Sequence, residues 1–141
     1  MKDGFDYSQF KEYINKFENM TETFDNWLKT FLLQQAERCI ARTKQRQRGL
    51  GLIDTGFMIN AWTIGDEASI NSVKQVGNSL EITLGNIADY SSYVEYGHTS
   101  RGGRWIDGGF MFTISLDEIE RAMPTRFNNE FVQFLKKWGV N

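Results

Sequence analysis

An apolar stripe in the first third of the chain constrains the fold more than any other feature of the sequence. Its residues return at intervals of three or four: Phe24, Trp27, Leu28, Phe31, Leu32, Ala36, Cys39 and Ile40. This spacing places them on one face of an α-helix, and such a face must be buried against another element. The helix is predicted to reach Arg48, about 40 Å along its axis, and to end at the glycines that follow.

The rest of the chain predicts a small sheet and more helices. Phe10 to Met20 repeats the helical spacing, and Thr21 or Thr23 is suited to cap a second helix. Between residues 60 and 86, apolar and polar residues alternate most clearly at 80–84, and Gly77-Asn78 suits a hairpin turn. An antiparallel meander packed against the long helix is therefore expected.

The chain of 141 residues is expected to form a single domain of the α+β class. A small antiparallel sheet would pack against the long N-terminal helix and the C-terminal helices. The predicted parts are a helical region (1–48), a sheet with a short helix (50–97), a flexible loop (98–109) and C-terminal helices (110–139). Pro124 is expected to kink the last part or to begin a new helix there.

Composition argues against several classes of protein. The formal net charge is −2, whereas a nucleic-acid binder usually carries a clearly basic face. The single cysteine, Cys39, excludes an intrachain disulfide and is predicted to be a small buried residue of the stripe. No segment approaches the roughly 18 apolar residues of a membrane span, and no signal peptide is visible. We expect a soluble protein made in the cytoplasm.

The sequence contains few residues that could form a catalytic site. His98 is the one histidine, and Glu95 is the carboxylate nearest to it in sequence, so they form the one candidate acid–base pair. No nucleophile with an orienting partner accompanies them, and hydrogen bonds that anchor the loop 98–109 are the favoured role. One Cys and one His do not make a zinc site. A non-catalytic protein with no cofactor or metal is expected.

Two groups of residues are candidates for contacts with partners. Arg42 and Arg46 belong to a basic end of the long helix, where cations are favoured by the helix dipole or can meet an acidic partner. Arg101, Arg104 and Trp105 lie in the glycine-rich loop, and Arg and Trp are frequent interface anchors.

Several short motifs together resemble a family of bacteriophage proteins. They are Asp54-Thr55-Gly56, Asn60-Ala61-Trp62, Glu81-Ile82, Tyr93-Val94-Glu95-Tyr96-Gly97-His98 and Gly109-Phe110-Met111. In this order they are similar to the tail-completion family of head–tail joining, tail-terminator-like proteins, over about Leu50 to Trp138. Asp54 and Gly56 would hold a structural turn.

The resemblance implies a structural virion protein at the head-proximal end of the tail, assembled in the host cytoplasm. Its copies would form a ring, commonly of six, that terminates the tail tube. Its partners would be further copies, the tube protein, the head connector or stopper, and the sheath in a contractile tail. A neck or capsid accessory module of a phage or tail-like bacteriocin is the alternative. We also expect the basic patch Arg38–Arg48 of one copy to meet the acidic N-terminal region of the next.

Overall fold

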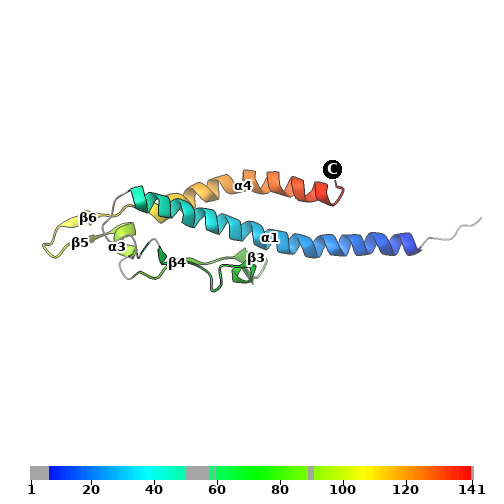
Figure 1. Ribbon diagram of the computed structural model, residues 1–141, viewed down its shortest axis with the longest axis horizontal. Helices are drawn as coiled ribbons and strands as arrows, with labels where there is room; N and C mark the ends of the chain where they lie inside the picture. Colours follow the sequence, from blue (N-terminus) through cyan, green and yellow to red (C-terminus); the bar gives the residue numbers. More distant parts are fainter. Residues whose placement is uncertain (1–6, 50–57, 59, 89–90, 141) are drawn as a thin grey trace, which may run out of the picture.

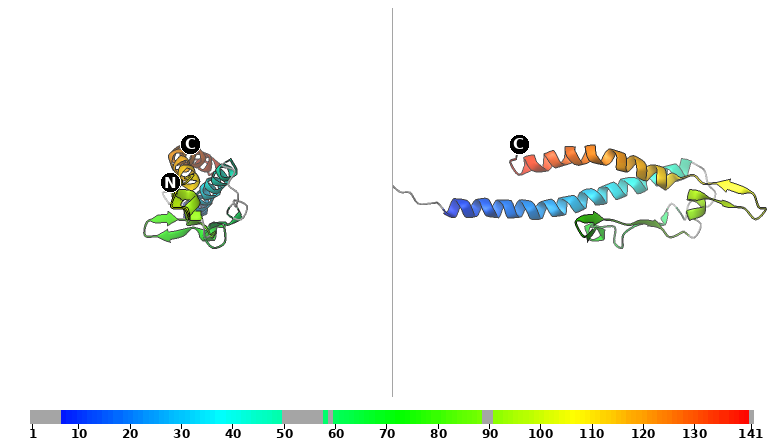
Figure 2. Two further views of the ribbon diagram at one scale, coloured as in Figure 1. Left: turned by 90° about the vertical axis from the view of Figure 1, so that its left-hand side faces the viewer. Right: turned by 180° about the vertical axis from the view of Figure 1, so that it is seen from behind.

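Two long helices dominate the computed structural model, which describes residues 7–49, 58, 60–88 and 91–140. Helix α1 spans Tyr7–Gly49 and helix α4 spans Met111–Lys137, and they lie side by side in opposite directions (Figure 1). Short strands lie along one side of this pair (Figure 2). The predicted α+β class, with a long N-terminal helix, a C-terminal helix and small antiparallel sheets, is confirmed.

Both helices continue where the sequence suggested a break. The prediction that a second helix begins at Thr21 or Thr23 is wrong, because α1 is one helix of 43 residues. An internal threonine costs a helix only a fraction of a kcal/mol, which is too little to interrupt a continuing apolar stripe. Likewise α4 runs through Pro124, so no new helix begins there. The predicted end of the long helix at Gly49 is confirmed.

Aromatic rings join the two helices along one seam. The ring of Phe24 lies 5.6 Å from that of Phe134, and the ring of Phe31 lies 5.5 Å from that of Phe127. Trp27 contacts both of these α4 rings. The buried positions of α1 include Cys39, as its place on the stripe predicted.

The strands form three separate two-stranded sheets rather than one meander. The predicted strand at 80–84 is divided, because its first part pairs with the preceding strand and its last part with a strand twenty residues earlier. Its alternation is nevertheless as expected: Leu80, Ile82 and Leu84 are half-buried, and Glu81 and Thr83 are exposed. The pairs are β1 (Trp62–Ile64) with β4 (Leu84–Asn86), β2 (Lys74–Val76) with β3 (Ser79–Glu81), and β5 (Gly97–Thr99) with β6 (Trp105–Asp107).

Two short helices complete the described elements, the 3-10 helix η1 (Ile70–Ser72) and α3 (Ser91–Tyr96). Helix α3 runs directly into β5, and β6 is followed closely by α4. The β5–β6 hairpin therefore sits between two helices at one end of the molecule, and the N-terminal part of α1 lies at the other end (Figure 1).

Candidate interaction site

The β5–β6 hairpin occupies most of the stretch 98–109, for which the sequence predicted a flexible loop. His98 pairs across it with Ile106, and Thr99 pairs with Trp105. The turn is closed by two backbone hydrogen bonds, from Ser100 N to Arg104 O (2.8 Å) and from Gly103 N to Ser100 O (2.9 Å). Gly103 has a φ of +79°, which glycine adopts without strain. Glycines thus permit a tight turn here rather than disorder.

Close backbone approaches fix the base of the hairpin. A Cβ on Gly108 would lie 2.3 Å from the carbonyl oxygen of Glu95, and a Cβ on Gly97 would lie 2.7 Å from the Trp105 ring. A larger residue at Gly108 would push the chain away from α3, and one at Gly97 would push β6 away from β5. The hairpin is therefore held close to the end of α3.

Glu95 connects α3 to the first turn of α4. Its carboxylate accepts hydrogen bonds from the backbone N–H groups of Phe112 (2.9 Å) and Thr113 (2.8 Å), and from the Thr113 hydroxyl (2.7 Å). Phe110, at the N-cap of α4, has a φ of +49° and provides no side-chain cap. Glu95 thus satisfies donors that the start of a helix leaves unpaired.

Large apolar side chains are exposed around the base of the hairpin, although the backbone there is fixed by the contacts of Gly97, Gly108 and Glu95. Tyr96 is 59% exposed and Trp105 is 58% exposed, and the Tyr96 ring meets that of Phe110 edge-on. Ile106 and Phe110 are exposed as well. We call Tyr96, Trp105, Ile106 and Phe110 the hairpin patch. An apolar group of this kind on a fixed support is typical of a protein–protein contact.

The predicted site residues lie in different parts of the molecule. Arg101 and Arg104 are exposed at the tip of the hairpin, next to the hairpin patch. His98 is half-buried on β5. Asp54 and Gly56 lie outside the described residues. The roles of all these residues as interface, anchor or turn stay predictions.

Arg42 and Arg46 make ion pairs within the chain. The Arg42 guanidinium donates to Glu118 Oε2 at 2.9 Å, and Arg46 also pairs with Glu118 and donates to the Ser115 hydroxyl at 2.9 Å. The hydrogen bond from Arg46, followed by the charges of both arginines, holds the pKa of Glu118 below its usual value. The two arginines therefore have a structural task within the chain, and their contact with a partner stays a prediction.

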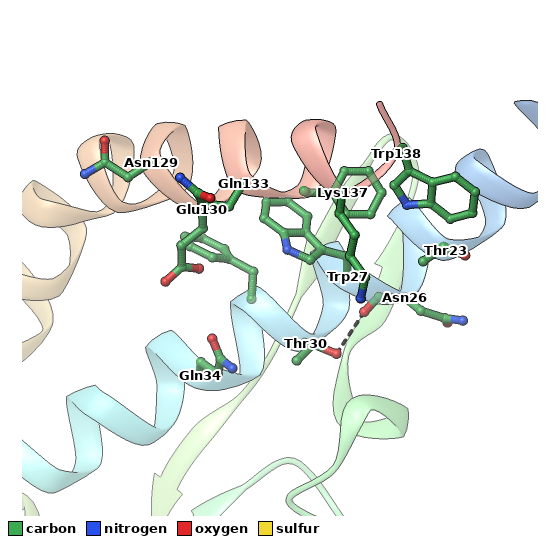
Figure 3. A pocket seen from close by; sticks show the side chains of 12 residues that line it. Thr23, Asn26, Trp27, Thr30, Gln34, Asn129, Glu130, Gln133, Lys137 and Trp138 are labelled. Atoms are coloured by element: carbon green, nitrogen blue, oxygen red, sulfur yellow. Dashed lines mark hydrogen bonds between the residues drawn. The ribbon is translucent and has the colours of Figure 1, made fainter. Parts of the chain in front are cut away.

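The structure has a cleft between α1 and α4 that was not predicted from the sequence. It has a volume of about 780 Å³ and lies beside the aromatic seam (Figure 3). Trp27 and Phe31 line it from α1, and Phe134 and Trp138 line it from α4. Phe31 and Phe134 are buried, whereas Trp27 and Trp138 are half-buried. The apolar spacing of both helices was visible in the sequence, but which rings stay accessible depends on how the helices pair.

Across the described part of the chain, no group of three or more potential ligands could hold a metal ion. None of the helices in this part of the chain is both long enough and apolar enough to cross a membrane.

Comparison with known proteins gives one family. Neither the curated proteins nor the solved structures contain a significant match. The family described as "Bacteriophage HK97-gp10, putative tail-component" matches residues 11–97, which is more than half of the chain. This match agrees with the resemblance to phage tail proteins noted in the sequence. The chain therefore belongs to the HK97-gp10-like family of bacteriophage tail components.

Proposed function

We propose that copies of this chain form a ring at the head-proximal end of the tail, where the ring terminates the tail tube and joins it to the head connector. Six copies are the expected number, by analogy with tail terminators. The tube protein, the connector or stopper and, in a contractile tail, the sheath are the proposed neighbours.

The hairpin patch is the observation that carries the proposal. It presents three exposed aromatic residues, Tyr96, Trp105 and Phe110. Their support is fixed by Glu95 and Gly108. A ring needs two different complementary surfaces on each subunit. The hairpin patch and the α1–α4 cleft differ in shape and lie apart along the molecule, which suits that requirement.

The accessible surface also supports assembly. The chain exposes 10194 Å², about a third more than the roughly 7,500 Å² of a compact monomer of this mass. Contacts with neighbours in a ring would cover part of this excess.

Electron microscopy of particles from a phage that lacks this gene tests the proposal. Overlong or ragged tubes, together with heads without tails, are expected. Tubes of normal length that are attached to heads would contradict both the terminating and the joining role. Tails of normal length that lack attached heads would indicate a neck protein instead.

A single substitution tests the hairpin patch within that function. Trp105→Ala is expected to weaken assembly by about 30-fold or more, because a central aromatic anchor contributes about 2 kcal/mol or more. Val76→Ala is the matched control, because Val76 is a similarly exposed apolar residue on the other hairpin, β2–β3. Equal effects of both substitutions would remove the hairpin patch from the interface.

A further inference from the structure

Helix α1 extends well beyond its partner helix. The pairing of Phe24 with Phe134 sets the register, so α4 ends at Lys137, close to the level of residue 21 of α1. Residues 7–20 therefore continue alone for about 21 Å (Figure 1). We call this segment the overhang.

The overhang has the sequence of an amphipathic helix. Phe10, Tyr13, Ile14 and Phe17 follow one another at spacings of three and four, which places them on one face. The charged residues of the segment are Lys11, Glu12, Lys16 and Glu18, so its net charge is zero. Of the two carboxylates, Glu18 flanks the apolar face, whereas Glu12 lies on the opposite face. Such a pattern is the usual form of a helix that binds in a groove.

The cleft between α1 and α4 has the dimensions of such a groove. Its α1 wall runs from Thr23 to Gln34, about 17 Å along the helix, which is close to the length of the overhang. Figure 3 shows the indole rings of Trp27 and Trp138 inside it. The lining combines four aromatic side chains, which form the aromatic base, with polar side chains such as Asn26 and Gln133.

Basic residues continue the same face of the helix pair. Arg38 follows Gln34 by one helical turn on α1, and Arg126 precedes Glu130 by one turn on α4. Arg126 is close enough to Arg38 and Arg42 that their charges, after the larger effect of burial, lower its pKa. Glu118 already pairs with Arg42 and Arg46. This end of the cleft therefore favours a negatively charged partner.

We propose that the overhang of a second copy of this chain binds in the α1–α4 cleft. Its apolar face would cover the aromatic base, and Glu18, which flanks that face, would approach Arg38 and Arg126. Each copy would then give one overhang and receive another, which is a head-to-tail contact of the kind that closes a ring. The inference rests on the proposed assembly and names the surfaces that make it.

Photo-cross-linking locates the overhang directly. A benzophenone amino acid replaces Phe17, and equal amounts of isotopically heavy and light full-length protein are mixed before irradiation. Mixed-mass cross-links from the overhang to peptides covering 23–34 or 129–138 are expected. Cross-links that join only peptides of the same mass, or that reach another surface, would overturn the inference.

Affinity measurements test the same contact independently. Phe17→Ala should weaken self-association by about tenfold or more, the usual cost of losing an aromatic anchor. Asn19→Ala is the control, because Asn19 is exposed on the opposite face of the overhang. Sedimentation measures the association, and circular dichroism verifies the helix content of each variant.

Charge reversal adds a test with rescue. Replacing Glu18 by lysine, or Arg38 and Arg126 by glutamate, should each weaken association by about 2- to 5-fold. The two altered proteins, when mixed, should associate more tightly than either does alone. If removal of residues 1–20 leaves association unchanged, the inference fails while the ring can stand on other surfaces. If the intact chain never associates, the inference and the ring both fail.

Discussion

Glu95 is a single side chain that joins two helices. It is only 6% exposed and accepts three hydrogen bonds from the first turn of α4. Glu95→Ala should lower the free energy of unfolding by roughly 1–3 kcal/mol, because it leaves buried donors without a partner. Urea titration measures this loss. Glu37→Ala, at an exposed position of α1, should change stability by less than about 0.5 kcal/mol, and an equal effect would exclude the capping role.

Glu118 gives the protein a specific pH dependence. Its pKa is lowered by the hydrogen bond from Arg46 and by the nearby charges, so its ionised form stabilises the folded state above the usual glutamate range. This contribution is lost as the pH falls through the lowered pKa. The stability difference between wild type and Glu118→Gln should therefore be largest above the usual glutamate pKa of about 4.3 and shrink as the pH falls below it. A difference that stays constant as the pH falls would show that the ion pairs do not act this way.

Single residues were predictable from the sequence when local spacing decided their environment. Cys39 is buried as expected, because the helical period alone assigns it to the apolar face. Glu95 was expected to bond to the loop, but its carboxylate bonds to residues 112 and 113. That contact depends on the chain reversal made by the hairpin, which no local pattern in the sequence reveals.

The aromatic seam holds the C-terminal half of α4 in place. Phe31 is 4% exposed, and its ring meets those of Trp27 and Phe127. Phe31→Ala should cost roughly 3–5 kcal/mol, the range for a buried phenylalanine. Hydrogen exchange should also accelerate in residues 124–137 more than in β5–β6. Val132→Ala, at an exposed site of α4, is the control, and comparable losses in both variants would contradict the role of the seam.

The helices were easier to predict than the sheets. A helical repeat can be seen within one segment, whereas strand pairing joins segments that are distant in sequence. The long stripe predicted the part of α1 after Met20, and the glycines predicted its end at Gly49, but the start of the same helix at Tyr7 was not predicted. In contrast, β1 pairs with β4 across twenty residues, and the pairing of Trp62 with Asn86 is decided by tertiary packing. Three-residue strands also carry too few alternating positions to identify their partners. Consequently the sequence located a β region between residues 60 and 86, but it predicted neither the pairing of these strands nor the β5–β6 hairpin.

The whole molecule is elongated, because α1 is far longer than the core that it supports. A helix of 43 residues extends for about 64 Å, whereas a compact chain of this size has a radius of gyration of about 14 Å. The two candidate surfaces, at the hairpin and along the cleft, are consequently far apart. This separation makes contact with two different neighbours geometrically straightforward.

Small-angle scattering of the dilute monomer tests this shape. We expect a radius of gyration of roughly 20 Å or more, because the extended helix sets the longest dimension. Removal of residues 1–20 should shorten the maximum dimension by about 20 Å and leave the stability of the α1–α4 seam unchanged, since its ring contacts begin at Phe24. Removal of residues 139–141, beyond the end of α4, is the control and should not shorten it comparably. A radius near 14 Å would mean that the overhang folds back onto its own subunit, which would leave no free helix for a second copy to receive.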